Sequence, residues 1–295
     1  METIKIQKLS KQYGKSRGIS DVDLSVSEGE IYGFIGPNGA GKSTTIKLLL
    51  NFIYPSGGSA SILGMDVVRE SKNIKLQTGY VPSEFSFYPE LKVSAMLKYA
   101  QSFYRNIDAD YIDELSSRFE LDLHKRFGDL SYGNKKKAAL VQAMIHRPRV
   151  LILDEPTNGL DPLMQQRLQE TLFALKENGT TVFLSSHNLN EVQDWCDRVS
   201  IIRDGIIVDS MAIDKSKMRN IHTIEVSAEQ LTEANILALG GLRPVKTDGT
   251  FVFDYEKDID SLIKALSAYT VQELFIRPKR LSELFMSYYT QEESK

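Results

Sequence analysis

A short apolar run at residues 31–35 is followed by a glycine-rich segment that fits the pattern G-x-x-x-x-G-K-[ST]. Its glycines let backbone N–H groups turn toward a phosphate, Lys42 adds a positive charge, and the Ser43 hydroxyl can bind Mg²⁺. A helix expected at 42–50 adds its positive N-terminal end. The predicted phosphate-binding loop consists of Gly36, Pro37, Asn38, Gly39, Ala40, Gly41, Lys42, Ser43 and Thr44.

A pair of carboxylates, Asp154 and Glu155, comes directly after a second apolar run at 150–153. In proteins with a phosphate-binding loop, a carboxylate at the end of such a strand holds Mg²⁺. The adjacent carboxylate can take a proton from an attacking water molecule as a general base. An acidic pair after a strand is by itself typical of a solvated loop, so this interpretation depends on the glycine-rich segment upstream. We therefore assign Mg²⁺ binding to Asp154 and the role of general base to Glu155.

Other polar residues allow both a structural and a chemical interpretation. Ser131 is suited to be a plain helix N-cap, or to direct its hydroxyl at a phosphate. The run Lys135 to Lys137 is typical of a solvated helix face, although Lys135 is also a candidate for phosphate contact. Only His187 follows a Ser-Ser pair after a strand, and a structural role is expected for the remaining histidines, His124, His146 and His222.

Several motifs, in the same order along the chain, resemble those of the ATPase subunits of ABC transporters. Residues 154–161, Asp-Glu-Pro-Thr-Asn-Gly-Leu-Asp, closely resemble the Walker B and D-loop run of that family. Residues 130–134, Leu-Ser-Tyr-Gly-Asn, stand where the family has its signature, usually LSGGQ. His187 stands in the position of the switch histidine, and Tyr13 in that of the aromatic residue that stacks on adenine. The resemblance covers residues 13–187.

The resemblance implies a head-to-tail dimer that holds two ATP molecules between its subunits. Each site would combine the phosphate-binding loop of one subunit with the signature of the other, where the Ser131 hydroxyl and the Gly133 N–H face the γ-phosphate. His187 would contact the γ-phosphate, Tyr13 would stack on adenine, and Asp161 of the D-loop run would belong to the same site. The implied ligands are ATP and Mg²⁺, and the implied catalytic residues are Glu155, His187 and Lys42.

The sequence departs from the family pattern at two positions. Tyr132 occupies a signature position that is commonly glycine, while the next residue, Gly133, is retained. Ser83 stands where the family has the glutamine of its Q-loop, and the shorter serine side chain cannot reach as far toward Mg²⁺. We expect Ser83 to contact Mg²⁺ through water, with the neighbouring Glu84 as the alternative replacement for the glutamine.

An aromatic cluster, Phe85, Phe87 and Tyr88, follows Ser83 in a polar segment. In the family, this loop joins the ATP site to the groove that receives the membrane subunit. Because exposed aromatic clusters often mark interfaces, the sequence predicts that these three side chains bind a short helix of the membrane partner. The alternative is that they belong to the core.

The pattern of apolar residues predicts an α/β core with an inserted helical subdomain, and the glycine-rich motif and the resemblance imply that this core is a P-loop ATPase. The ATPase domain is expected at 1–215, with the helical subdomain at about 85–147, where the apolar spacing is helical. A smaller accessory domain is expected at 216–295. Its elements follow the order βαββαβ, which matches a ferredoxin-like α+β fold, and an apolar final helix is expected at 281–289.

Composition excludes some classes of protein. The 295 residues include 36 Lys and Arg and 39 Asp and Glu, a net charge of −3, which argues against nucleic acid as a partner. A single cysteine, Cys196, allows no internal disulfide and is typical of a reduced, cytoplasmic protein. No apolar run is as long as a membrane span. Work at a membrane would therefore need a separate membrane-spanning permease subunit, with this chain peripheral on the inner face of the cell membrane.

The sequence therefore predicts an ATP-hydrolysing subunit that powers transport through that permease. The segments Gly79 to Glu84 and Leu130 to Lys137, with the C-terminal extension, most resemble bacterial ABC-2 type exporters, which implies export. A second ATPase subunit, identical or different, completes the dimer. The alternative is a soluble ABC-type ATPase that acts on ribosomes or DNA. Such proteins typically carry two cassettes or a long coiled-coil insertion, whereas this chain has one P-loop and no sustained heptads.

Overall fold

The chain divides into two units, residues 1–213 and 214–295. A six-stranded sheet forms the centre of the first unit. The computed structural model describes residues 1–14, 16–105, 107–213 and 221–278. The strand order is β10-β9-β3-β8-β7-β6, parallel except for β10, which forms a hairpin with β9. The strands are β3 (Ile31–Ile35), β6 (Thr78–Val81), β7 (Val150–Asp154), β8 (Thr181–Ser186), β9 (Arg198–Arg203) and β10 (Ile206–Ala212).

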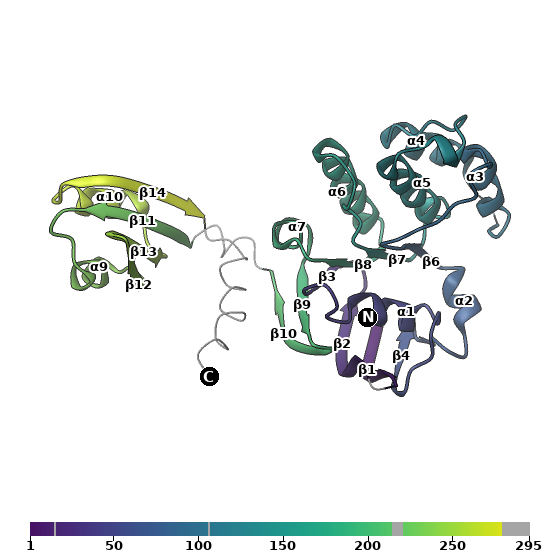
Figure 1. Ribbon diagram of the computed structural model, residues 1–295, viewed down its shortest axis with the longest axis horizontal. Coiled ribbons are helices and arrows are strands. Elements are labelled where there is room, and N and C mark those ends of the chain that lie inside the picture. The colour runs from purple at the N-terminus through teal and green to yellow at the C-terminus, as the bar shows by residue number, and fades with distance from the viewer. Residues whose placement is uncertain (15, 106, 214–220, 279–295) are drawn as a thin grey trace. The chain divides into compact units, whose positions relative to one another are not determined.

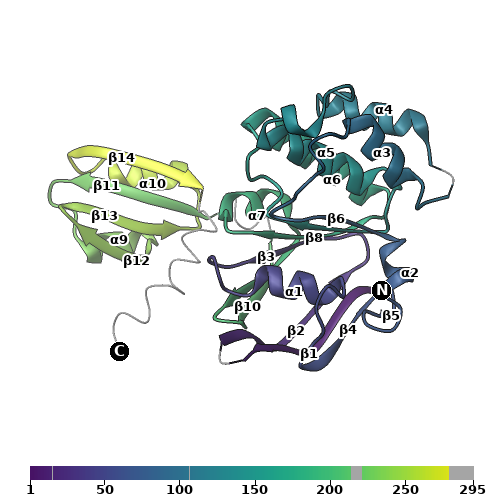
Figure 2. The same cartoon turned by 45° about the vertical axis from the view of Figure 1, so that its right-hand side comes forward.

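A second, antiparallel sheet of the order β2-β1-β4-β5 belongs to the same unit. Its strands are β1 (Glu2–Tyr13), β2 (Ser16–Ser27), β4 (Gly57–Ile62) and β5 (Met65–Asp66). Helix α1 (Lys42–Leu49) lies between the two sheets, as Figure 2 shows, and buries Ile46 and Leu49 in a core that both sheets share. Because α1 is packed on two sides, the loop before it is held in a fixed position.

Helices cover the other face of the six-stranded sheet (Figure 1). The predicted helical subdomain at about 85–147 contains α3 (Val93–Gln101), α4 (Ala109–Arg118), the short 3₁₀ helix η1 (Phe127–Asp129) and α5 (Tyr132–Met144). Helix α6 (Pro162–Glu177) begins at the predicted N-cap, since the Asp161 side chain accepts a hydrogen bond from the Met164 N–H at 3.0 Å. The remaining helices of this unit are α2 (Ser71–Lys75) and α7 (Leu189–Trp195).

The second unit has one antiparallel sheet of the order β12-β13-β11-β14. Its elements are β11 (His222–Ala228), α9 (Glu233–Leu239), β12 (Leu242–Thr247), β13 (Thr250–Tyr255), α10 (Ile259–Leu266) and β14 (Val271–Pro278). Ile236 of α9 and Leu262 of α10 join Ile224 and Phe253 in one apolar core. The predicted final helix at 281–289 and the polar stretch at 215–220 lie outside the described residues. Among the helices that are described, none has the length and apolar character needed to cross a membrane.

Candidate active site

The glycine-rich loop connects the buried strand β3 to the N-terminus of α1, as predicted. Gly41, the residue before the helix, has a φ of 113°, a conformation that side chains of L-residues rarely adopt. A Cβ atom at this position would also lie 2.7 Å from Cγ2 of Ile19. The sequence therefore needs glycine here to turn the chain into the helix, whose first N–H groups have no partner within the helix.

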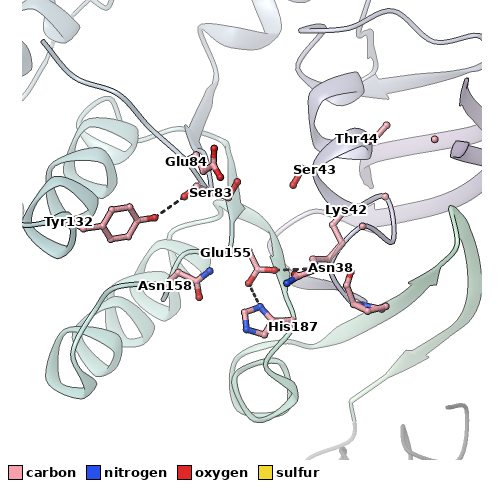
Figure 3. Close-up of a pocket in the computed structure, with 14 residues that line it drawn as sticks. Asn38, Lys42, Ser43, Thr44, Ser83, Glu84, Tyr132, Glu155, Asn158 and His187 are labelled. Carbon is pink, nitrogen blue, oxygen red and sulfur yellow. Dashed lines mark hydrogen bonds and ion pairs between the residues drawn. The ribbon is translucent and has the colours of Figure 1, made fainter. Parts of the chain in front are cut away.

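A cavity of about 500 Å³ opens over this loop (Figure 3). It brings together the ends of β3, β6, β7 and β8 with the start of α1. This arrangement is expected at the carboxyl edge of a parallel sheet, where ligands bind in α/β proteins. The lining residues are Gly18, Pro37, Asn38, Gly39, Gly41, Lys42, Ser43, Thr44, Ser83, Glu84, Tyr132, Glu155, Asn158 and His187.

Glu155 lies at the centre of the polar contacts in this cavity. Its φ of 51° is in the left-handed region, which costs about 1 kcal/mol or more for a residue with a side chain. The Glu155 N–H donates to the Ser185 carbonyl at 3.2 Å, which fixes the turn after β7. In this position Oε1 lies 3.2 Å from Nζ of Lys42, and Oε2 lies 2.8 Å from Nδ1 of His187. Glu155 is thus in direct contact with the other two predicted catalytic residues, Lys42 and His187.

Lys42 is buried and directed back along the loop. Its ammonium group donates to the Gly36 carbonyl at 2.7 Å and to the Pro37 carbonyl at 3.3 Å. With Glu155 as a third partner, the charge has the contacts that a buried cation needs. This explains the position of Gly36, which does not line the cavity but supplies an acceptor to the lysine.

Asp154 is the last residue of β7 and is 1% exposed. It does not line the cavity. Its Oδ1 accepts a hydrogen bond from the Ser185 hydroxyl at 2.5 Å, so the carboxylate is oriented by the neighbouring strand β8. Ser43 and Ser83, the other predicted Mg²⁺ ligands, do line the cavity.

A buried carboxylate, Glu191, supports the loop that carries His187. Its side chain accepts hydrogen bonds from the Thr157 hydroxyl at 2.7 Å, the Ser186 hydroxyl at 3.1 Å and the Asn188 amide at 2.9 Å. The contacts tie the segment after Glu155 to the segment around His187. The sequence analysis missed Glu191, although its place three residues after Asn188, the N-cap of α7, is a local signal of a helix start. Only its partner Thr157 is distant in the chain.

Several predicted nucleotide-binding residues lie outside the cavity of their own subunit. Ser131 is the N-cap of α5 and accepts from the Asn134 N–H at 3.3 Å. Gly133 lies against Gly159, since a Cβ atom on Gly133 would lie 2.5 Å from the Gly159 carbonyl oxygen. Tyr13 is 44% exposed, and Asp161 caps α6. Ala40 is buried, and its carbonyl accepts from the Gly205 N–H at 3.0 Å.

Two interpretations of the sequence are wrong. The run Lys135 to Lys137 does not form a solvated helix face, because Lys136 and Lys137 are both buried in α5. Burial lowers the pKa of Lys136 to about 8, against the attraction of the Asp154 and Glu155 carboxylates. The helix faces the loop after β6, a contact between segments far apart in sequence, and the charged run gave no sign of it.

The second correction concerns the aromatic cluster. Phe87 stacks on the buried Phe127 with ring centres 4.1 Å apart, and Phe85 stacks on Tyr132 at 5.2 Å. Both are partly buried within the subunit, so they do not form an exposed surface together with Tyr88. Only Tyr88 is widely exposed, at 72%.

Comparison with known proteins gives matches over most of the chain. A family model described as "ABC transporter" matches residues 19–158. The chain is 33% identical over 267 residues to the bacitracin transport ATP-binding protein BcrA of Bacillus licheniformis, which covers 90% of this chain and 85% of the relative. The chain belongs to the ABC transporter family. A solved structure of the ATP-binding subunit of an ABC transporter has a TM-score of 0.68 and 32% identity, and covers 74% of this chain and 92% of that one.

A further ABC relative, the Nod factor export ATP-binding protein I of Rhizobium meliloti, is 30% identical and covers 96% of this chain and 87% of its own length. The protein is therefore an ATP-binding and ATP-hydrolysing ABC subunit that serves transport. Such subunits pair with membrane components and dimerise. The alternative of an ABC-type ATPase acting on ribosomes or DNA is not supported by these relatives, both of which are transport proteins by name.

Proposed function

We propose that ATP binds in the cavity with its phosphates over the N-terminus of α1. Lys42, Ser43 and Thr44 at the start of this helix line the cavity and are placed for the outer phosphates. No acidic residue lies in the first turn of α1, so nothing there repels an anion. Adenine would stack on Tyr13, which is exposed and lies beside the cavity residue Gly18.

The residues near the cavity fit Mg²⁺. Ser43, Asp154 and Ser83 offer only oxygen ligands, which Mg²⁺ prefers, and the ion commonly keeps several waters beside phosphate oxygens. In the described part of the chain, no group of three His, Cys, Asp or Glu side chains could hold a metal alone, which suits an ion bound partly by the nucleotide. Bound there, Mg²⁺ would neutralise negative charge on the phosphates. In this proposal Ser83 acts through water, and Glu84, which also lines the cavity, is the alternative.

Hydrolysis would use Glu155 as the general base. The observation that carries this assignment is the contact of its carboxylate with both Lys42 and His187 inside the P-loop cavity. A γ-phosphate would compete for Lys42, since it carries more negative charge than the carboxylate. Glu155 would then be available to take a proton from water, and His187 would contact the γ-phosphate.

We infer that a second ATPase subunit completes each site. Ser131 and Gly133 do not line the cavity of their own chain, although the signature is the part of the family pattern that faces the γ-phosphate. A head-to-tail dimer, of identical or different subunits, would bring this segment and Asp161 to the site of the partner. The exposed N-cap Ser131 supports this, because its hydroxyl can still donate to an anion while it accepts from Asn134.

The ATPase would drive export through a membrane-spanning permease, with the chain peripheral on the cytoplasmic face of the membrane. The Nod factor export relative supports this direction. Tyr88, the exposed member of the aromatic cluster, is our candidate for contact with a short permease helix. We also infer that the second unit is a ferredoxin-like accessory domain, which its βαββαβ order and its sheet order support.

The test is co-expression with a candidate permease, followed by purification in detergent. We expect the two chains to copurify and ATP hydrolysis to rise above that of the isolated subunit. Stimulation by ribosomes or DNA instead, with no effect of the membrane protein, would support the alternative function and overturn the proposal.

A further inference from the structure

Two residues of α5, Tyr132 and Lys136, contact the loop that follows β6. They are four positions apart and therefore lie on the same face of the helix. The Tyr132 hydroxyl donates to the Ser83 carbonyl at 2.9 Å, a contact shown in Figure 3. One turn later, the Lys136 ammonium donates to the Pro82 carbonyl at 3.2 Å. Consecutive carbonyls of the loop are thus bound by successive turns of one helix.

The ring of Phe85 fills the space beside these contacts. It stacks on Tyr132 with ring centres 5.2 Å apart, and the Lys136 ammonium lies 5.7 Å from its centre. A stacked aromatic pair and a cation over a ring both contribute to binding. Three residues of the loop, 82, 83 and 85, are therefore attached to α5.

Lys136 also reaches the Mg²⁺ side of the site. Its ammonium lies 3.5 Å from the backbone carbonyl of Asp154, and the side chain is fully buried. Within the described chain no ion pair joins Lys136 to a carboxylate, and its hydrogen-bond partners are two carbonyls. Burying a cation without an ion pair costs stability. The contacts of Lys136 join three segments, α5, the loop and the end of β7, so this buried cation is placed to hold them in position.

Serine in place of glutamine makes the position of the loop more important. The Ser83 hydroxyl is one bond beyond Cβ, so the backbone fixes its distance from Mg²⁺, whereas a longer side chain can adapt. We propose that Tyr132 and Lys136 form a clamp that sets the position of the Ser83 backbone relative to Asp154, and that both act as positioning residues for hydrolysis. This inference rests on the proposed roles of Ser83 and Asp154 at Mg²⁺.

The experiment compares Lys136→Met, Lys136→Arg, Tyr132→Phe and the double variant Tyr132→Phe/Lys136→Met in the full chain. ATP hydrolysis is measured against ATP and against Mg²⁺. We expect Lys136→Met to lower kcat by about tenfold or more, because a small displacement of an active-site group has a large effect on rate. The KM for ATP should change less than threefold, and half-maximal activity should need more Mg²⁺. Lys136→Arg should recover a large part of the activity, since it retains charge and donors.

Tyr132→Phe keeps the ring and removes only the hydroxyl. Loss of one hydrogen bond predicts a several-fold lower kcat and the same shift in Mg²⁺ dependence. Because both residues hold one loop, the effects of the double variant should not be additive. Lys98→Met, an exposed lysine of α3, is the matched control and should behave as the unmodified chain does.

Folding is checked by thermal unfolding and by binding of a fluorescent ATP analogue. A folded Lys136→Met with unchanged kcat and Mg²⁺ dependence would overturn the clamp, and so would Tyr132→Phe with unchanged kinetics if Lys136→Met does not fold. Asp154→Ala distinguishes a failure of the proposed Mg²⁺ site from a failure of the clamp. Full turnover in Asp154→Ala would mean that the proposed Mg²⁺ site is wrong, whereas an inactive Asp154→Ala beside a fully active Lys136→Met would remove only the clamp.

Discussion

His187 and Glu155 are joined directly, with Nδ1 of the histidine 2.8 Å from Oε2 of the glutamate. The other carboxylate oxygen of Glu155 lies 3.2 Å from Nζ of Lys42. Glu155, the proposed general base, thus joins Lys42 and His187 in one polar group. In our proposal the phosphates of ATP also bind Lys42, so they would compete with Glu155 for it. The contact would then link nucleotide binding to the availability of the base.

The first prediction follows from this contact. Glu155→Gln should bind ATP but hydrolyse it 10² to 10⁴ times more slowly, the usual cost of losing a general base, because a carboxamide cannot accept the proton. ATP and Mg²⁺ should then convert the isolated subunit from monomer to dimer, measured by light scattering. Glu114→Gln, an exposed position in α4, is the control and should keep normal turnover. A Glu155→Gln subunit that stays monomeric at saturating ATP would contradict the sandwich dimer.

Glu191 provides a second prediction. Its carboxylate accepts from Thr157, Ser186 and Asn188, and truncation would leave these donors without their partner. Unpaired buried donors cost about 1–3 kcal/mol, so Glu191→Ala should lower the thermal stability clearly. Turnover should fall as well, because the His187 loop loses its support. Glu170→Ala, at an exposed site on α6, should change neither property. Wild-type unfolding and turnover in Glu191→Ala would show that this network is dispensable.

Parts of the site whose geometry is set by neighbouring residues could be predicted from the sequence. The P-loop, its strand and its helix are contiguous in the chain, and the glycine at position 41 fits the positive φ found there. Their arrangement could therefore be predicted from the sequence. The strand before Asp154 and the cap at Asp161 are local in the same sense. Their positions in the fold could be predicted because each motif contains its own geometric reason.

Contacts between segments that are distant in the chain could not be predicted from the sequence. Lys136 belongs to a charged run, and its burial depends on the Pro82 carbonyl, 54 positions earlier. Phe87 appears in a polar segment, and its burial depends on Phe127. The buried network of Glu191 depends on Thr157, 34 positions earlier. In each case the partner, not the residue type or its neighbours, decides the environment.

A pH-dependent prediction concerns His146, which stacks on Tyr104 with ring centres 3.9 Å apart. Burial lowers the pKa of His146 from 6.5 to about 4. Between these values the unfolded chain binds a proton that the folded chain does not, so stability falls as the pH drops from 6.5 toward 4. The difference corresponds to at most ~3 kcal/mol. His146→Gln should show a smaller loss of stability over this range, measured by urea unfolding at each pH. Equal slopes for both proteins would exclude His146 as a source.

Replacing Phe87 and replacing Tyr88, two members of the aromatic cluster, should have different effects. Phe87→Ala removes a ring that packs on buried Phe127, so it should destabilise the subunit by about 2–4 kcal/mol. Tyr88→Ala removes an exposed ring and should leave stability and basal ATP hydrolysis of the isolated subunit nearly unchanged. Stimulation by the permease should weaken in Tyr88→Ala if this residue docks the partner. Full stimulation in Tyr88→Ala would mean that the contact lies elsewhere.

The last prediction concerns the second unit. Among the described residues, those that line the cavity all lie between Gly18 and His187, within the unit of residues 1–213, and the strands that position them belong to that unit. The second unit has a core of its own around Ile224, Phe253 and Leu262. A chain ended at Asn220 should therefore fold and bind a fluorescent ATP analogue with an affinity within about threefold of the full chain, because it keeps all the cavity residues that the structure describes. Lys42→Ala in the same truncated chain is the control and should abolish most binding, since it removes the charge that we propose faces the phosphates. A truncated chain that unfolds cooperatively but has no affinity for the analogue would show that residues after 220 contribute to the nucleotide site.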